Sequence, residues 1–157
     1  RFYIISKVLN IEDIVYIKNR LLMIPKDIGN VLGLYYGNTI GNTFERLFYN
    51  QLNLTIQVID AYIQKEPDAL SEDTIRLLDE NTYLIANLFS QINPNLNQRE
   101  LEDLFCCQLE LTREELLKRI NKDYMGDVNL YDFIEYHALM FADIITEGLT
   151  KQFYEKS

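Results

Sequence analysis

Apolar side chains recur at intervals of three and four residues along most of this chain, and this spacing constrains the fold more than any other sequence feature. A period of 3.6 residues places such side chains on one face of an α-helix. The two longest regular stripes are Phe44, Leu47, Phe48, Leu52, Thr55, Ile56, Ile59 and Ile63, followed by Leu70, Ile75, Leu78, Thr82, Ile85, Leu88, Phe89 and Ile92. No stretch alternates like a strand, so the sequence predicts an all-α fold.

The ends of the predicted helices carry recognisable signals. Ser71 before two acidic residues predicts the start of the second long helix, and Pro94 ends it. Asn97 and Glu100 have the spacing of a capping box and predict a third helix, which runs through Ile120 and is broken by Gly126. A fourth helix is expected over about 128–153.

The region before residue 38 is less regular. Residues 1–9 are typical of the end of a helix, and because the chain begins at Arg1 rather than Met we expect that helix to start earlier. Residues 12–24 predict a short helix ended by Pro25, and residues 26–36 another ended by Gly37. We therefore expect one helical domain over 1–157, with short helices over 1–37 and a four-helix up-down bundle over 38–153.

The composition excludes several classes of partner. Twenty-four acidic against fifteen basic residues give the chain a net charge of −9, which repels nucleic acid and anionic lipid surfaces. Cys106 and Cys107 are adjacent and are the only cysteines, so no intramolecular disulfide framework is expected. The absence of such a framework fits a cytoplasmic location. We expect the two cysteines to be buried as small apolar side chains, with a redox or metal role as the alternative.

Part of the sequence is repeated. The segment that begins at Phe44 and the segment that begins at Leu101 share seven of twelve residues at an offset of 57, and Gln51 matches Gln108. The helices that follow match more weakly at an offset of 56, which pairs Asn81 with His137. The pattern predicts two related helical hairpins whose matched positions face one another.

These four matched residues, Gln51, Asn81, Gln108 and His137, are the candidate ligand-binding residues. One polar group on each of four helices is the arrangement of di-metal carboxylate proteins, but those sites need about four carboxylates and two histidines. Only His137 could serve as a metal ligand here. A buried hydrogen-bonded layer that sets helix register is the favoured interpretation, and a metal or small-molecule site is the alternative.

Other chemical motifs are incomplete. Residues 121–133 partly fit a calcium loop, but Met125 at its fifth position offers no oxygen and Asp132 at its twelfth is too short. A turn between helices explains the same residues. The chain has no Gly-rich phosphate loop, no nucleophile elbow and no second histidine, so we predict no catalytic residues.

Several phrases together resemble a family of small bacterial proteins from spore-forming Gram-positive organisms, some of which are labelled acetylglutamate kinase. The phrases are Asn19-Arg20-Leu21-Leu22, Pro25-Lys26-Asp27, Leu34-Tyr35-Tyr36-Gly37-Asn38, Ile92-Asn93-Pro94, Tyr131-Asp132-Phe133-Ile134-Glu135, Ala138-Leu139-Met140-Phe141-Ala142-Asp143, Glu147-Gly148 and Lys151-Gln152-Phe153. They cover nearly the whole chain. The resemblance implies a small cytoplasmic helical protein. Members of the family often have His at the positions where this chain has Gln51 and Gln108.

Three functions follow, in order of preference. The first is a non-enzymatic binding or regulatory bundle that contacts a protein or a second copy of itself, without a cofactor. The second is a degenerate ferritin-like bundle that binds a divalent metal or small molecule in its core. The third is the kinase that the family label implies, which would need a larger α/β domain with Gly-rich loops.

Overall fold

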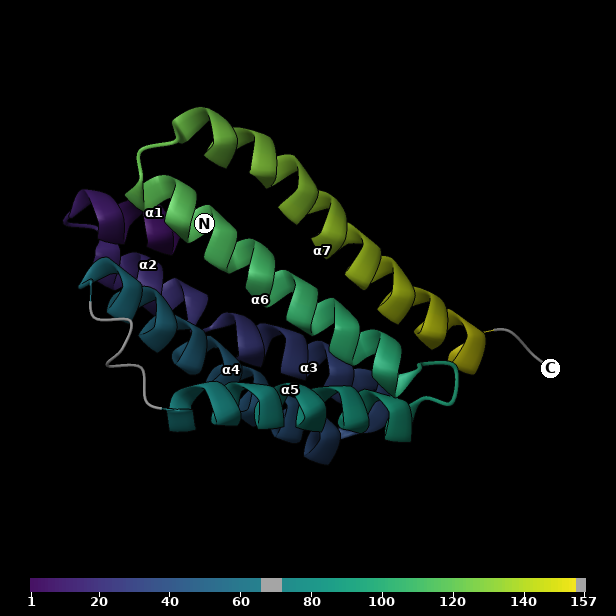
Figure 1. Ribbon diagram of the computed structural model, residues 1–157. Coiled ribbons are helices and arrows are strands. Elements are labelled where there is room, and N and C mark those ends of the chain that lie inside the picture. The colour runs from purple at the N-terminus through teal and green to yellow at the C-terminus, as the bar shows by residue number, and fades with distance from the viewer. Residues whose placement is uncertain (66–71, 155–157) are drawn as a thin grey trace. The chain divides into compact units, whose positions relative to one another are not determined.

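The computed structural model describes residues 1–65 and 72–154, and every regular element in that part of the chain is a helix (Figure 1). In chain order the helices are α1 (Phe2–Leu9), α2 (Ile14–Leu21), α3 (Ile24–Tyr36), α4 (Asn38–Ile63), α5 (Glu72–Ile92), α6 (Gln98–Ile120) and α7 (Tyr124–Phe153). The all-α prediction is confirmed. None of the helices in the described ranges combines the length and the apolarity that crossing a bilayer requires.

The chain divides into two compact units, Arg1–Asn81 and Thr82–Ser157. The first unit holds α1 to α4 and the first half of α5, whereas the second holds the rest of α5 with α6 and α7. Helix α5 therefore passes from one unit into the other at Asn81. The single domain over 1–157 and the four-helix bundle over 38–153 stay predictions.

Helix α1 is attached to α4 in the first unit through its buried face. Tyr3 and Ile4 are buried, and the Tyr3 hydroxyl donates a hydrogen bond of 3.0 Å to Oδ1 of Asp60. The ammonium of Lys7 lies 3.1 Å from the same oxygen. Burial first, and then the hydrogen bond to Asp60, raise the pKa of Tyr3, so the hydroxyl stays a donor at physiological pH.

The prediction that Pro25 ends a helix is wrong. Helix α2 ends at Leu21, and Pro25 lies in the first turn of α3, which begins at Ile24. Proline lacks the N–H that would remain unpaired in a first turn anyway, and its fixed φ suits that position. A proline after an apolar stretch can therefore begin a helix as readily as end one.

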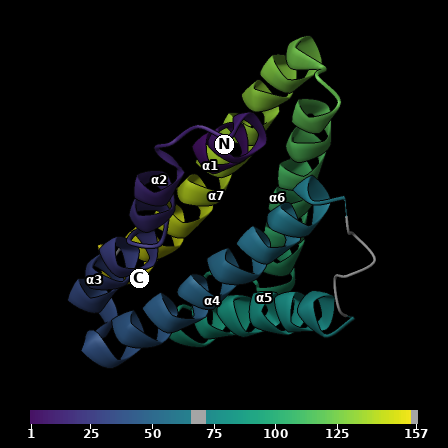
Figure 2. The ribbon, with the colours of Figure 1, turned by 90° about the vertical axis from the view of Figure 1, so that its left-hand side faces the viewer.

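Helices α3 and α4 cross at unusually short range because glycines form their contact. A Cβ built on Gly29 would lie 2.7 Å from the backbone oxygen of Gly41, closer than any side chain tolerates. Gly37 joins the two helices with a φ of 87°, a backbone conformation that other residues rarely adopt. Figure 2 shows α3 and α4 meeting at this corner, and the predicted stop at Gly37 is confirmed.

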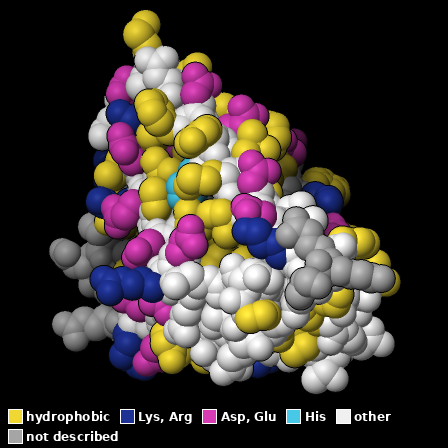
Figure 3. Space-filling view, turned by 90° about the vertical axis from the view of Figure 1, so that its right-hand side faces the viewer, with side chains coloured by type: hydrophobic (Ala, Val, Ile, Leu, Met, Phe, Trp, Pro, Cys, Tyr) yellow, Lys and Arg dark blue, Asp and Glu magenta, His cyan; other side chains and the backbone are white. Residues whose placement is uncertain are grey.

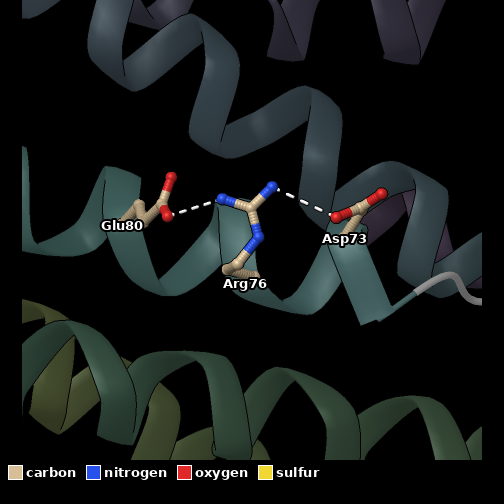
Figure 4. Close-up of polar contacts among 3 residues, drawn as sticks. All are labelled: Asp73, Arg76 and Glu80. Carbon is tan, nitrogen blue, oxygen red and sulfur yellow. Dashed lines mark hydrogen bonds and ion pairs between the residues drawn. The ribbon is translucent and has the colours of Figure 1, made fainter.

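The first turns of α5 carry a small charged network on the surface. The guanidinium of Arg76 donates to Glu80 at 2.6 Å and to Asp73 at 3.1 Å, as the close-up in Figure 4 shows. Pairs at these spacings are exposed to solvent and stabilise a helix only weakly. The predicted cap at Ser71 lies outside the described residues.

Helix α6 begins as predicted, and it pairs with α7 in the second unit. The side chain of Asn97 accepts a hydrogen bond of 3.1 Å from the backbone N–H of Glu100, which confirms the cap. The rings of Phe105 and Phe141 pack edge to face with centroids 5.0 Å apart. Near the end of α7, the amide of Gln152 donates to the last carbonyl of α5, that of Ile92, at 2.9 Å.

Two predictions about α6 and its connection to α7 are wrong. Gly126 does not break a helix: α7 already begins at Tyr124, and Gly126 donates its N–H to the capping carboxylate of Asp123. Lys122 instead takes the left-handed conformation in the turn. The turn is held by a buried ion pair between Arg119 and Asp127. Cys106 and Cys107, expected to be buried, are both exposed.

Candidate functional site

Gln51 and Asn81 form a closed polar pair in the first unit. Both side chains are buried, and the amide nitrogen of Asn81 donates to Oε1 of Gln51 at 2.8 Å. The same nitrogen also donates to the backbone carbonyl of Leu47 at 2.8 Å. Both hydrogens of the Asn81 amide are thus used within the protein, which is the arrangement of a structural hydrogen bond.

Gln108 and His137 form the matching pair in the second unit. Nδ1 of His137 lies 3.1 Å from Oε1 of Gln108. An amide oxygen can only accept, so Nδ1 carries the proton and donates. A glutamine carbonyl therefore accepts a side-chain N–H in both pairs. The structure brings the four candidate residues together two by two, and a single layer of all four stays a prediction.

The backbone beside each glutamine repeats as well. The hydroxyl of Thr55 donates to the carbonyl of Gln51, and the hydroxyl of Thr112 donates to the carbonyl of Gln108, both at 2.8 Å. These threonines are matched by the sequence repeat. At these matched positions the same local contact therefore occurs in the two units.

The other nitrogen of His137 has no partner. Nε2 is buried and forms no hydrogen bond with any described residue, although the side chain is only 7% exposed. Because Nδ1 holds the proton of the neutral ring, Nε2 carries a lone pair that can accept a hydrogen bond or bind a cation. Burial lowers the pKa of His137, since a charged ring would lose its hydration there.

His137 also lines an open cavity of about 470 Å³, which we name the His137 cavity. Its wall comes from the first half of α6 and the middle of α7. In Figure 3 the single histidine lies among hydrophobic and acidic side chains. The lining residues are Asn97, Arg99, Glu100, Asp103, Leu104, Cys107, His137 and Met140.

The sequence interpretation found His137 and missed the other members of this cavity. A signal was present, because Glu100, Asp103 and Cys107 are three and four residues apart and so share one face of α6. His137 and Met140 are likewise three residues apart on α7. The sequence does not indicate that these two helix faces meet.

A metal centre of the ferritin-like kind finds little support in the donor set. In the parts of the chain that the structure describes, no three side chains of His, Cys, Asp or Glu lie close enough together to hold a metal ion. The carboxylates that line the cavity with His137 are Glu100 and Asp103, and both are exposed. Exposed side chains that are not preorganised hold a metal ion weakly.

Comparison of the chain with family models, with curated proteins and with solved structures finds no match in any of the three. The resemblance to the bacterial family and its kinase label therefore stays a prediction.

Proposed function

We propose that this protein is a non-enzymatic binding protein that contacts a partner through the exposed side of α7. The observation that carries the proposal is an apolar surface on that helix, which we name the α7 outer face. It consists of Met125, Val128, Tyr136 and Leu139, whose side chains are 58% to 78% exposed. At 100° per residue these four positions fall within one narrow arc of the helix.

The α7 outer face lies opposite the side by which α7 packs in its own unit. Leu130, His137 and Gly148 are buried and point about half a turn away from the four exposed residues. A helix with apolar residues on both sides is normally covered on both sides. Exposed apolar surface of this kind marks a site of protein interaction.

Charge defines the kind of partner. Asp132 and Asp143 fall within the same arc, are exposed, and form no ion pair with any described residue. Two copies of this face would bring carboxylates together in a chain of net charge −9. The face therefore suits an amphipathic partner helix that carries Lys or Arg beside its apolar side chains.

Site-specific photo-crosslinking tests this function. A photoreactive phenylalanine analogue in place of Tyr136 should yield a discrete cross-linked partner in extracts of the source cells. The same analogue in place of Tyr83, an exposed tyrosine of α5, is the matched control and should yield none. Leu139→Lys should abolish the product, because it places a cation where the partner's cations lie.

Two results would contradict the proposal. Cross-links only between copies of this chain, with a concentration-dependent increase in mass, would replace the partner by self-association. A monomer that gives no cross-link from Tyr136, or equal products from both positions, would remove the α7 outer face as a binding surface.

Ligand binding beside Gln108 and His137 is the second candidate function, and the unpartnered Nε2 of His137 favours it. A metal ion or a small molecule that reached this nitrogen would supply its missing contact. Binding only to the native state at a hundred times the dissociation constant adds about 2.7 kcal/mol to the free energy of unfolding. Thermal melts of metal-stripped protein with Mn²⁺, Fe²⁺, Zn²⁺ or Ca²⁺ test the metal, and His137→Asn should remove any shift.

The same contacts support the repeated architecture that the sequence predicts. We propose that α4 with α5, and α6 with α7, descend from one duplicated hairpin and form an up-down bundle. The matched hydrogen bonds at Gln51 and Gln108 support the duplication. Disulfide or dipolar distance measurements between α4 and α7 would test the bundle, and separations beyond one helix diameter would contradict it.

A further inference from the structure

The size and the wall of the His137 cavity suit a small organic molecule. Its volume of about 470 Å³ lies within the range of small-molecule sites. Leu104 and Met140 provide apolar surface from the two helices, and the Cys107 thiol lies on the same wall. This cavity belongs entirely to the second unit, so its wall does not depend on the first.

The charged groups of the wall select for a cation. Glu100 and Asp103 are one turn apart on α6 and form no ion pair with the described residues. Arg99 is the cationic lining residue, so two carboxylates and one guanidinium leave the wall with a formal charge of −1. A cation between the carboxylates gains attraction that an anion of the same size would lack.

His137 adds a requirement for a hydrogen-bond donor. Its Nε2 is buried with a lone pair and no partner, a state that costs free energy until a donor arrives. Nε2 is buried, so a donor reaches it only when the side chains that cover it move. Met140 can move at low cost because its side chain has three rotatable bonds.

From these observations we propose that the His137 cavity binds a small primary amine with an apolar body. An N–H group of the ammonium supplies the donor that Nε2 of His137 lacks, the carboxylates of Glu100 and Asp103 attract the cation from the cavity wall, and the apolar body packs on Leu104 and Met140. The inference deepens the second candidate function, ligand binding beside Gln108 and His137, and rests on it.

Titration of the full-length ¹⁵N-labelled chain with 2-phenylethylamine, followed by NMR, tests the proposal. At about pH 7.5 the ring of His137 is neutral and the amine is charged. Amide shifts should concentrate in residues 97–107 and 137–140, and the Nε2 resonance of His137 should move as it accepts a hydrogen bond. We expect 2-phenylethanol and phenylacetate to bind at least about tenfold more weakly than the amine, since neither carries a positive charge.

Matched variants separate the site from the general acidity of the surface. His137→Asn keeps an N–H for Gln108, as Asn81 does for Gln51, but removes the Nε2 acceptor and should weaken amine binding about tenfold. Glu100→Gln combined with Asp103→Asn should do the same. Asp79→Asn combined with Glu135→Gln removes the same charge from exposed residues away from the cavity wall and should leave the affinity within about twofold.

The proposal is overturned if the amine causes no localised shifts up to about 10 mM, a concentration at which even weak fragments bind. It is also overturned if phenylacetate binds as well as the amine, or if the control pair weakens binding as much as the cavity pair. If Zn²⁺ or phenylacetate causes shifts around His137 and the amine does not, the amine proposal is rejected and the second candidate function is kept. No shift with any of these ligands would remove both.

Discussion

Gln51 with Asn81 and Gln108 with His137 occupy matched positions of the sequence repeat, yet their surroundings differ. Each pair joins a glutamine carbonyl to a side-chain N–H, at 2.8 Å in the first unit and 3.1 Å in the second. The second hydrogen of the Asn81 side-chain amide is donated to the backbone carbonyl of Leu47. The neutral ring of His137 has no second N–H to donate. Its Nε2 has no partner among the described residues, and the residue lines a cavity.

The difference shows how the residue type at one matched position of the sequence repeat can decide between a structural contact and a candidate site. An amide at this position is satisfied by the glutamine and the backbone of its neighbour, and the pair is closed. An imidazole makes the same first contact and carries a second polar atom farther from the backbone. That atom needs a partner that the described residues do not provide.

The largest expected effect comes from opening the closed pair. Asn81→Leu keeps the approximate side-chain volume but removes both amide hydrogens. The buried side-chain carbonyl of Gln51 then loses the N–H that Asn81 donates to it. We expect the free energy of unfolding to fall by about 2–3 kcal/mol, measured by urea denaturation. A loss below about 0.5 kcal/mol would show that this pair is not the stabilising contact that its geometry indicates.

Exchanging the two residues should have unequal results. Asn81→His places an imidazole in a closed site and should cost about 1–2 kcal/mol through overpacking. His137→Asn recreates the closed pair in the second unit and should change the free energy of unfolding by less than about 0.5 kcal/mol at neutral pH. The same urea series measures both variants. Equal losses would mean that the two pairs have equivalent surroundings.

A smaller effect is expected in the pH dependence of the free energy of unfolding, and it concerns His137 in the second unit. Burial lowers the pKa of His137 in the folded chain, whereas the unfolded chain titrates near its usual pKa of about 6.5. The unfolded state therefore binds the proton first, and stability falls as the pH drops below about 6.5 until the lowered pKa is reached. One proton contributes at most about 1.4 kcal/mol per pH unit.

His137→Asn is the control for this prediction, because it removes the titrating group and keeps the contact with Gln108. Unfolding curves between about pH 7 and 5.5 should be flatter for the variant than for the parent chain. A variant that loses stability with the same slope as the parent would assign the pH dependence to other residues.

The smallest expected effect concerns the part of the repeat that does not differ. Thr55→Val and Thr112→Val each remove a hydroxyl that donates to the carbonyl four residues earlier. Such bonds contribute little to a helix, so each variant should change stability by less than about 0.5 kcal/mol. The two changes should agree with one another, and a clear difference between them would limit the equivalence of the two units to Gln51 and Gln108.

Local contacts were the part of this protein that could be predicted well. The stripe that contains Phe44 and Leu47 predicted a long helix, and α4 is that helix. The cap at Asn97 and the stop at Gly37 depend on a few neighbouring residues, and both are confirmed. Pro25 and Gly126 were misjudged because each residue type suits either end of a helix, and its neighbours decide which.

The sequence was enough to predict that the chain is helical and where most of its helices lie, and to match four positions in a repeat: Gln51, Asn81, Gln108 and His137. Periodicity, capping and repetition are written in neighbouring residues, so they can be seen without coordinates. Coordinates were needed to see that Gln51 bonds Asn81 and Gln108 bonds His137, that Nε2 of His137 has no partner among the described residues, and that Glu100 and Asp103 line its cavity. The physical reason is that these contacts join helix faces 29 or more residues apart in the chain, and packing alone selects which faces meet.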